Sequence, residues 1–216
     1  MRPDPRSRFL APVVAMLLAF ALVSQAAESE DARYYRESYV REHAGDFATA
    51  IEVMERASKA SRASYFHQLR LGWLLYLAGE HADSISAYER AVALEPAAVE
   101  PYLGLLLPQI AKRAWSAAEQ TARTALTRDP GSYLARSRLA WVLFSQGRHA
   151  EAEVEYRTVL QLHPADLEMR SGLGWSLLEQ GKHQEAAKEL ERVLAVSPDN
   201  SSARTGLEEI RRATSR

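Results

Sequence analysis

Three histidines are the first residues whose type and spacing suggest chemistry, because imidazole is the commonest metal ligand in proteins. They are His81, His149 and His183, and the last two are 34 residues apart. Metal ligands must converge to within about 2 Å of one ion. These residues can form a metal site only if the fold brings all three together. The remaining histidines follow no regular spacing: His43, His67 and His163.

The sequence contains no motif of a known catalytic mechanism. The stretch "GWSLLEQGK", starting at Gly174, places six residues between its glycines, whereas a phosphate-binding loop needs four. There is no cysteine, no nucleophile elbow and no zinc-binding histidine pair on one helix turn. Carboxylates such as Glu151, Glu153 and Glu155 are typical of a solvated helix face. We therefore expect no enzyme activity, no catalytic residue and no cofactor.

Composition indicates a folded helical protein. The chain has 216 residues, 47% hydrophobic and 25% charged, with ten glycines and a formal net charge of −1. A chain with this charge has no strong positive field for phosphates. Neither nucleic acid nor an anionic membrane surface is an expected partner of the folded part.

The first 26 residues have the pattern of a signal peptide. Arg2, Arg6 and Arg8 precede an apolar run, and small Ser24 and Ala26 provide a cleavage site. The run is shorter than the roughly 20 residues of a spanning helix. We predict a signal peptide over 1–26, a linker over 27–30 and a periplasmic mature protein. The alternative is an uncleaved leader that anchors the chain in the inner membrane, facing the periplasm, which would be its only membrane contact.

A period of 34 residues runs through the rest of the chain. Pro96, Pro130, Pro164 and Pro198 follow one another at this interval. The related stretches "LGWLLYLAGEHADS" and "LGWSLLEQGKHQEA" are 102 residues apart, which is three periods. Five units fit without an insertion: 31–64, 65–98, 99–132, 133–166 and 167–200. Positions below are counted from the first residue of each unit.

Each unit has the pattern of two helices joined by a turn. Apolar residues recur at spacings of three and four, and a glycine at position 15 ends the first helix. In the second unit the recurring pattern consists of Leu71, Gly72, Gly79, Tyr88, Ala91 and Pro96, with Ser84 at the usual alanine of position 20. This pattern resembles the tetratricopeptide repeat (TPR) family.

The resemblance implies an all-α solenoid of five helical hairpins in a right-handed superhelix. The first helix of each hairpin would line a concave groove. Residues 201–216 have room for one more helix, which we expect to cap the last apolar face. The three histidines at position 17 then lie on different units, so we predict helix packing or capping for them and no metal site.

The first helices carry an aromatic and aliphatic stripe at positions 2, 5, 9 and 12. Position 9 is aromatic in four units of five. The predicted groove residues, with two arginines of position 6, are Tyr35, Tyr39, Phe66, Leu69, Arg70, Trp73, Tyr76, Leu103, Leu107, Ile110, Leu134, Arg138, Trp141, Phe144 and Trp175.

Two interpretations of this stripe remain open at the level of sequence. The tryptophans either fill space between successive first helices or expose apolar surface to a ligand. Both interpretations can apply to different faces of one ring. The arginines of position 6, which include Arg36, either pack internally or suit a ligand with some negative charge. TPR domains that clamp a terminal carboxylate use Lys and Asn at positions such as 5 and 9, and Leu69 with Trp73 excludes that mode.

The third unit departs from the pattern. Position 15 is Arg113 instead of glycine, and Pro108 falls inside the predicted first helix. Because an interior proline removes one backbone hydrogen bond, we predict a kink between Gly104 and Pro108.

The sequence therefore predicts a periplasmic TPR adaptor. We expect it to bind an extended or helical protein segment through apolar anchors and to organise a cell-envelope assembly. The first alternative is a glycan-binding or polysaccharide-export component in which Trp73, Trp141 and Trp175 stack on sugar rings. The second alternative is a structural protein that associates with itself.

Overall fold

The computed structural model describes residues 29–60 and 64–215, and every regular element in these ranges is an α-helix. The chain divides into two units, Met1–Ser61 and Arg62–Arg216. The described part of the first unit is one hairpin of α2 (Glu30–His43) and α3 (Phe47–Ala60). Its buried side chains include Ala50, Val53 and Met54 of α3.

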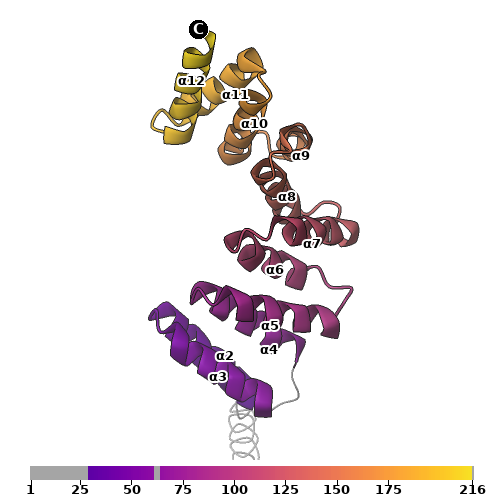
Figure 1. Cartoon of the computed structure of the whole chain (residues 1–216). Helices are drawn as coiled ribbons and strands as arrows, with labels where there is room; N and C mark the ends of the chain where they lie inside the picture. Colours follow the sequence, from indigo (N-terminus) through magenta and orange to yellow (C-terminus); the bar gives the residue numbers. More distant parts are fainter. Residues whose placement is uncertain (1–28, 61–63, 216) are drawn as a thin grey trace, which may run out of the picture. The chain divides into compact units, whose positions relative to one another are not determined.

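The second unit holds four further hairpins and a last helix, each packed on the next (Figure 1). Its helices are α4 (Tyr65–Leu77), α5 (His81–Leu94), α6 (Glu100–Ala111), α7 (Trp115–Arg128), α8 (Tyr133–Ser145), α9 (His149–Leu162), α10 (Leu167–Glu179), α11 (His183–Val196) and α12 (Ser201–Thr214). The predicted all-α solenoid of helical hairpins is confirmed. No helix in the described ranges combines the length and apolarity that crossing a membrane requires.

The turn inside each hairpin depends on a residue with a positive φ angle. Gly45, Gly79, Gly147 and Gly181 have φ between 73° and 81°. In the turn after α4, the Glu80 N–H donates to the carbonyl of Leu75 over 2.9 Å, which satisfies an otherwise unpaired helix-end carbonyl. In the third unit Arg113 takes the same place with φ 54°, at the cost of backbone strain that glycine avoids.

Position 34 of a unit caps the next first helix. Ser64, Ser132, Asp166 and Asn200 each accept a hydrogen bond from the amide three residues later. The exception precedes the third unit, where α6 begins after Val99 without a side-chain cap. The third unit is thus irregular at both ends of its first helix.

Helix α6 continues through Pro108 without a break in helical structure. The carbonyl of Pro108 accepts the N–H of Lys112 over 3.0 Å, so the helix ends regularly after the proline. The predicted bend between Gly104 and Pro108 stays a prediction for the helix axis.

Glycines on the first helices receive large side chains of the preceding second helix. A Cβ atom at Gly104 would lie 2.2 Å from the ring of Tyr88, and one at Gly172 would lie 2.5 Å from the ring of Tyr156. Where the second helix carries only Ala122 instead of tyrosine, the first helix of the next repeat has Arg138 in place of glycine. A large side chain on the second helix therefore faces a small residue on the next first helix, and a small side chain faces a large residue.

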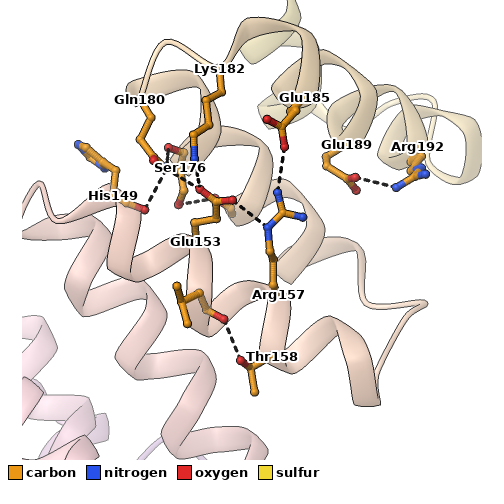
Figure 2. Close-up of polar contacts among 12 residues, drawn as sticks. His149, Glu153, Arg157, Thr158, Ser176, Gln180, Lys182, Glu185, Glu189 and Arg192 are labelled. Atoms are coloured by element: carbon orange, nitrogen blue, oxygen red, sulfur yellow. Dashed lines mark hydrogen bonds and ion pairs between the residues drawn. The ribbon is translucent and has the colours of Figure 1, made fainter.

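A polar cluster joins α9 to the hairpin that follows it (Figure 2). The carboxylate of Glu153 accepts hydrogen bonds from Arg157, Gln180 and Lys182 over 2.8 to 2.9 Å. Burial by itself raises the pKa of Glu153, but these three donors outweigh it and lower the pKa to about 2. Glu119 makes the equivalent contacts with Arg123 and Arg148 one repeat earlier, so the last three hairpins share one kind of polar junction.

Candidate functional site

An open cleft of about 560 Å³ lies in the second unit between α8, α10 and α12. It is lined by Trp141, Phe144, Glu168, Ser171, Gly172, Trp175, Glu179, Asn200 and Ser202. Three of these residues, Trp141, Phe144 and Trp175, belong to the predicted stripe. The structure thus places part of that stripe around one hollow.

Helical spacing brings the lining residues of α10 onto one face. Glu168, Trp175 and Glu179 are separated by seven and four residues, which corresponds to two turns and one turn of helix. Trp141 takes the same place on α8 as Trp175 takes on α10, because the two are 34 residues apart. The repeat therefore presents two indoles to the same cleft from neighbouring first helices.

Trp141 is the most open aromatic side chain of the cleft. Its side chain is 49% exposed. Its ring stacks on Phe144 with centroids 5.9 Å apart and an interplanar angle of 18°, and Phe144 contacts the ring of His149 edge-on at 5.0 Å. The indole is thus supported from its own hairpin, and half of its surface stays available for a ligand.

Trp175 is half-buried and held in a fixed orientation. Its indole N–H donates to the hydroxyl of Ser202 over 2.8 Å, and that hydroxyl lies 3.2 Å from the hydroxyl of Ser171. A Cβ atom at Gly206 would lie 3.5 Å from the indole, so α12 packs closely against it. Trp175 therefore both packs between repeats and lines the cleft, as sequence allowed for one ring.

The predicted residues on α4 and α6 lie outside this cleft. Phe66 is 66% exposed, whereas Trp73 is half-buried and lies against Tyr76 with ring centroids 5.9 Å apart. Leu134 on α8 is also exposed. The aliphatic residues of the set are half-buried: Leu69, Leu103, Leu107 and Ile110. Ile110 packs against the core, as Phe144 and Trp175 also do, and its place in a partner groove stays a prediction.

The two tyrosines predicted in the first unit are on α2. Tyr39 is 52% exposed, and Tyr35 is half-buried. Neither is among the residues that line the cleft of the second unit. Their assignment to a partner surface stays a prediction.

The arginines correct the expected charge of the site. Arg70 is only 7% exposed, so it is an interior side chain and not a cation on a groove surface. Arg138 is half-buried and donates to the carbonyl of Leu103 over 2.6 Å, which ties α8 to α6. Burial lowers the pKa of Arg138, partly offset by the hydroxyls of Tyr76 and Tyr88. Arg138 therefore joins two repeats, and neither arginine lines the cleft.

Sequence reasoning missed the polar residues of the cleft. Glu168, Ser171, Glu179, Asn200 and Ser202 line it but were not predicted. Glu168 and Ser171 occupy positions 2 and 5 of the last unit, where the predicted stripe includes only apolar and aromatic residues. The available signal was the spacing of Glu168 and Glu179 on the same helix face as Trp175.

The histidines of position 17 each begin a second helix. The ring of His81 lies 5.6 Å from that of Tyr76, and the ring of His149 lies 5.0 Å from that of Phe144. The two rings pack inside their own hairpins. Across residues 29–60 and 64–215, no three His, Asp or Glu side chains are grouped so that they could hold a metal ion.

A stack of helical hairpins with a cleft on its first helices defines a solenoid protein of the scaffold class. Family models described as tetratricopeptide repeat match residues 35–99, 109–175 and 143–210, and the chain belongs to the TPR family. A protein of this fold serves to bind other proteins. No curated protein matches the sequence significantly.

Several solved structures share the fold. The crystal structure of MamA protein matches with 23% identity over 75% of this chain and 88% of that chain, at a TM-score of 0.69. A TPR protein from Parabacteroides merdae matches with 15% identity over 82% of this chain and 71% of that one, at 0.76. A thermophilic TPR protein from Thermus thermophilus matches with 18% identity over 82% and 97%, at 0.60. Identities this low establish the fold alone.

Proposed function

We propose that this chain is a periplasmic adaptor that holds a segment of a partner protein in the cleft between α8, α10 and α12. By binding that segment on its stack of hairpins, it organises a larger assembly of the cell envelope. The TPR fold supplies the class of function, and the cleft supplies the surface.

The observation that carries this proposal is the exposure of Trp141 beside Trp175. Apolar surface gains about 25 cal/mol for each Å² removed from water, so an indole that is half exposed is a strong anchor for a ligand. Aromatic side chains in well-packed pockets are typical binding hot spots. A volume of about 560 Å³ can enclose several side chains of a bound segment.

The periplasmic location rests on the N-terminal sequence, which lies outside the described residues. Arg2, Arg6 and Arg8 precede an apolar run that ends at small residues, as in an exported protein. If the leader is retained, the repeats would face the periplasm from an inner-membrane anchor.

The test is affinity capture in the source organism with three tagged forms of the chain. They are the parent, the Trp141→Ala/Trp175→Ala variant and a control with Val154→Ala/Leu162→Ala. Val154 and Leu162 are 61% and 68% exposed on α9 and do not line the cleft. Circular dichroism checks that all three are equally helical.

The proposal predicts a partner that the parent and the control both retain and the cleft variant loses. If the cleft variant retains the same proteins as the parent, the two tryptophans are packing residues and the proposal fails. Capture from a periplasmic extract, compared with capture from a cytoplasmic extract, tests the compartment separately.

Polar groups around the indoles favour glycan binding as a second candidate function. Ser171, Asn200 and Ser202 place hydroxyl and amide groups beside the rings, as a site that stacks on sugars requires. Titration with envelope oligosaccharides, followed by tryptophan fluorescence, tests this candidate. Saturable binding that Trp141→Ala abolishes would support it, and no change in fluorescence would exclude the sugars tested.

A further inference from the structure

We infer that the cleft selects an extended partner segment in which a lysine or arginine lies next to an apolar anchor residue. This inference rests on the proposed function and specifies the chemistry of the partner. The arginines of position 6 suggested a ligand with some negative charge, but those arginines do not line the cleft. The inference instead assigns a positive charge to the ligand.

The charged side chains of the cleft are both acidic. Glu168 and Glu179 are exposed and line it, and its lining includes no lysine, arginine or histidine. Within the described part of the chain, no hydrogen bond or ion pair joins either carboxylate to another residue. The cleft therefore offers negative charge beside apolar surface, and a cationic ligand complements it.

Carboxylates on the opposite helices of the same repeats are used differently. Glu153 is paired with Arg157 and Lys182, and Glu189 is paired with Arg170 and Arg192. The pair of Glu153 with Lys182 joins one hairpin to the next, and the pair of Glu189 with Arg170 joins the two helices of the last hairpin. The carboxylates on the second helices are thus paired with basic side chains within the protein. The two carboxylates of the cleft are left for other contacts.

The place of Glu179 on its helix gives a second, independent argument. Glu168 lies in the first turn of α10, where the helix dipole favours an acid. Glu179 is the last residue of α10, where the same dipole opposes a negative charge. Helix stability gives no reason for an acid at this end, but a bound cation would offset the repulsion.

The spacing of the two glutamates from Trp175 along α10 suits a bound segment that has one basic side chain next to one apolar side chain. With a rise of about 1.5 Å per residue, Glu179 lies about 6 Å along the helix from Trp175 and Glu168 about 10 Å in the other direction. An apolar side chain between the indoles of Trp141 and Trp175 would place a neighbouring lysine within reach of a carboxylate. Its alkyl stem or its charge could also pack on an indole face.

The amide of Asn200 favours an extended backbone. Its side-chain oxygen accepts the N–H of Ala203 over 2.9 Å and so caps α12. The NH2 group on the same amide makes no hydrogen bond within the described residues, and it is a donor. An extended segment presents backbone carbonyls that can accept it, whereas a helix uses its carbonyls internally.

The test uses short capped peptides and the full chain. One peptide has a central leucine flanked by lysines, and two matched peptides carry glutamates or serines in place of the lysines. Binding is followed by tryptophan fluorescence at low and high salt. We expect the lysine peptide to bind about tenfold more tightly than the glutamate peptide, and added salt to reduce this preference.

A pair of variants assigns the preference to the cleft. Glu168→Gln/Glu179→Gln removes both charges with little change in shape, and Glu191→Gln/Glu209→Gln is the control because both residues are exposed and outside the cleft. The first variant should lose most of the preference for lysine, and the control should keep it. Equal binding of the three peptides, or a preference that survives in the first variant, would overturn the inference.

These outcomes separate the inference from the proposed function. If Trp141→Ala/Trp175→Ala abolishes partner capture while the peptides show no charge preference, the cleft is the binding surface and only its selectivity is wrong. If that variant captures the same partners as the parent, both fail.

Discussion

Arg113 shows at the scale of one residue how the repeat tolerates a departure from its pattern. Its φ of 54° lies in the left-handed region that glycine occupies at the equivalent turn of the other four hairpins. We expect Arg113→Gly to stabilise the fold by about 0.5–1 kcal/mol, because the relief of backbone strain exceeds the added entropy of the unfolded chain. Urea unfolding checks this. A lower midpoint for the variant would show that the arginine side chain stabilises the turn in another way.

Glu153 makes stability depend on pH. Its folded-state pKa of about 2 is below the ordinary 4.5, so its contribution is present above pH 4.5 and is lost as pH falls toward about 2. We expect Glu153→Gln to cost about 1–2 kcal/mol at pH 7, because Lys182 and Arg157 lose their charged acceptor. Urea unfolding at several pH values should show the difference shrink as pH falls below 4.5.

The exposed Glu191→Gln is the matched control for that experiment, since Glu191 lies on the surface of α11. It should match the parent at every pH. A Glu153→Gln variant as stable as the parent at pH 7 would mean that the charge of Glu153 in the cluster of Figure 2 does not stabilise the fold.

Contact between successive hairpins depends on the size of the side chain at position 6 of the first helix. We expect Gly104→Ala to destabilise the fold by about 1–3 kcal/mol, although alanine favours helix, because its Cβ would lie 2.2 Å from the ring of Tyr88. Gly131→Ala is the control, since its Cβ would meet only Asp129 Oδ1 at 3.4 Å. Thermal unfolding of both measures the effect.

Removing the opposing ring provides a second check on that contact. In a Tyr88→Ala background, Gly104→Ala should cost much less than it does alone, because the space is then empty. The same cost in both backgrounds would mean that something other than the ring resists the added methyl group.

The elements themselves were largely predictable from sequence. The period of 34 placed each pair of helices, because proline and glycine recur at the turns and apolar residues keep helical spacing between them. The charge of the candidate site was not predictable in the same way. Arg70 and Glu168 are both charged residues on first helices, and only the tertiary packing decides that Arg70 is buried and Glu168 is exposed.

At the scale of the whole chain, the N-terminal segment gives a prediction that needs no structure. If residues 1–26 are a signal peptide, the protein recovered from the source organism begins at Ala27. Intact-mass measurement and N-terminal peptide sequencing check this. A chain that begins at Met1 and fractionates with the inner membrane would favour the anchored form instead.

The proposed function depends on which surface the stack of hairpins presents to a partner. The most direct measurement places a photo-crosslinking amino acid at position 141, in the cleft, or at position 154, on α9, in the living source organism. We predict a partner protein that crosslinks from position 141 and not from position 154. The same crosslinked partner from both positions, or a partner from position 154 alone, would show that the cleft is not the partner-binding surface.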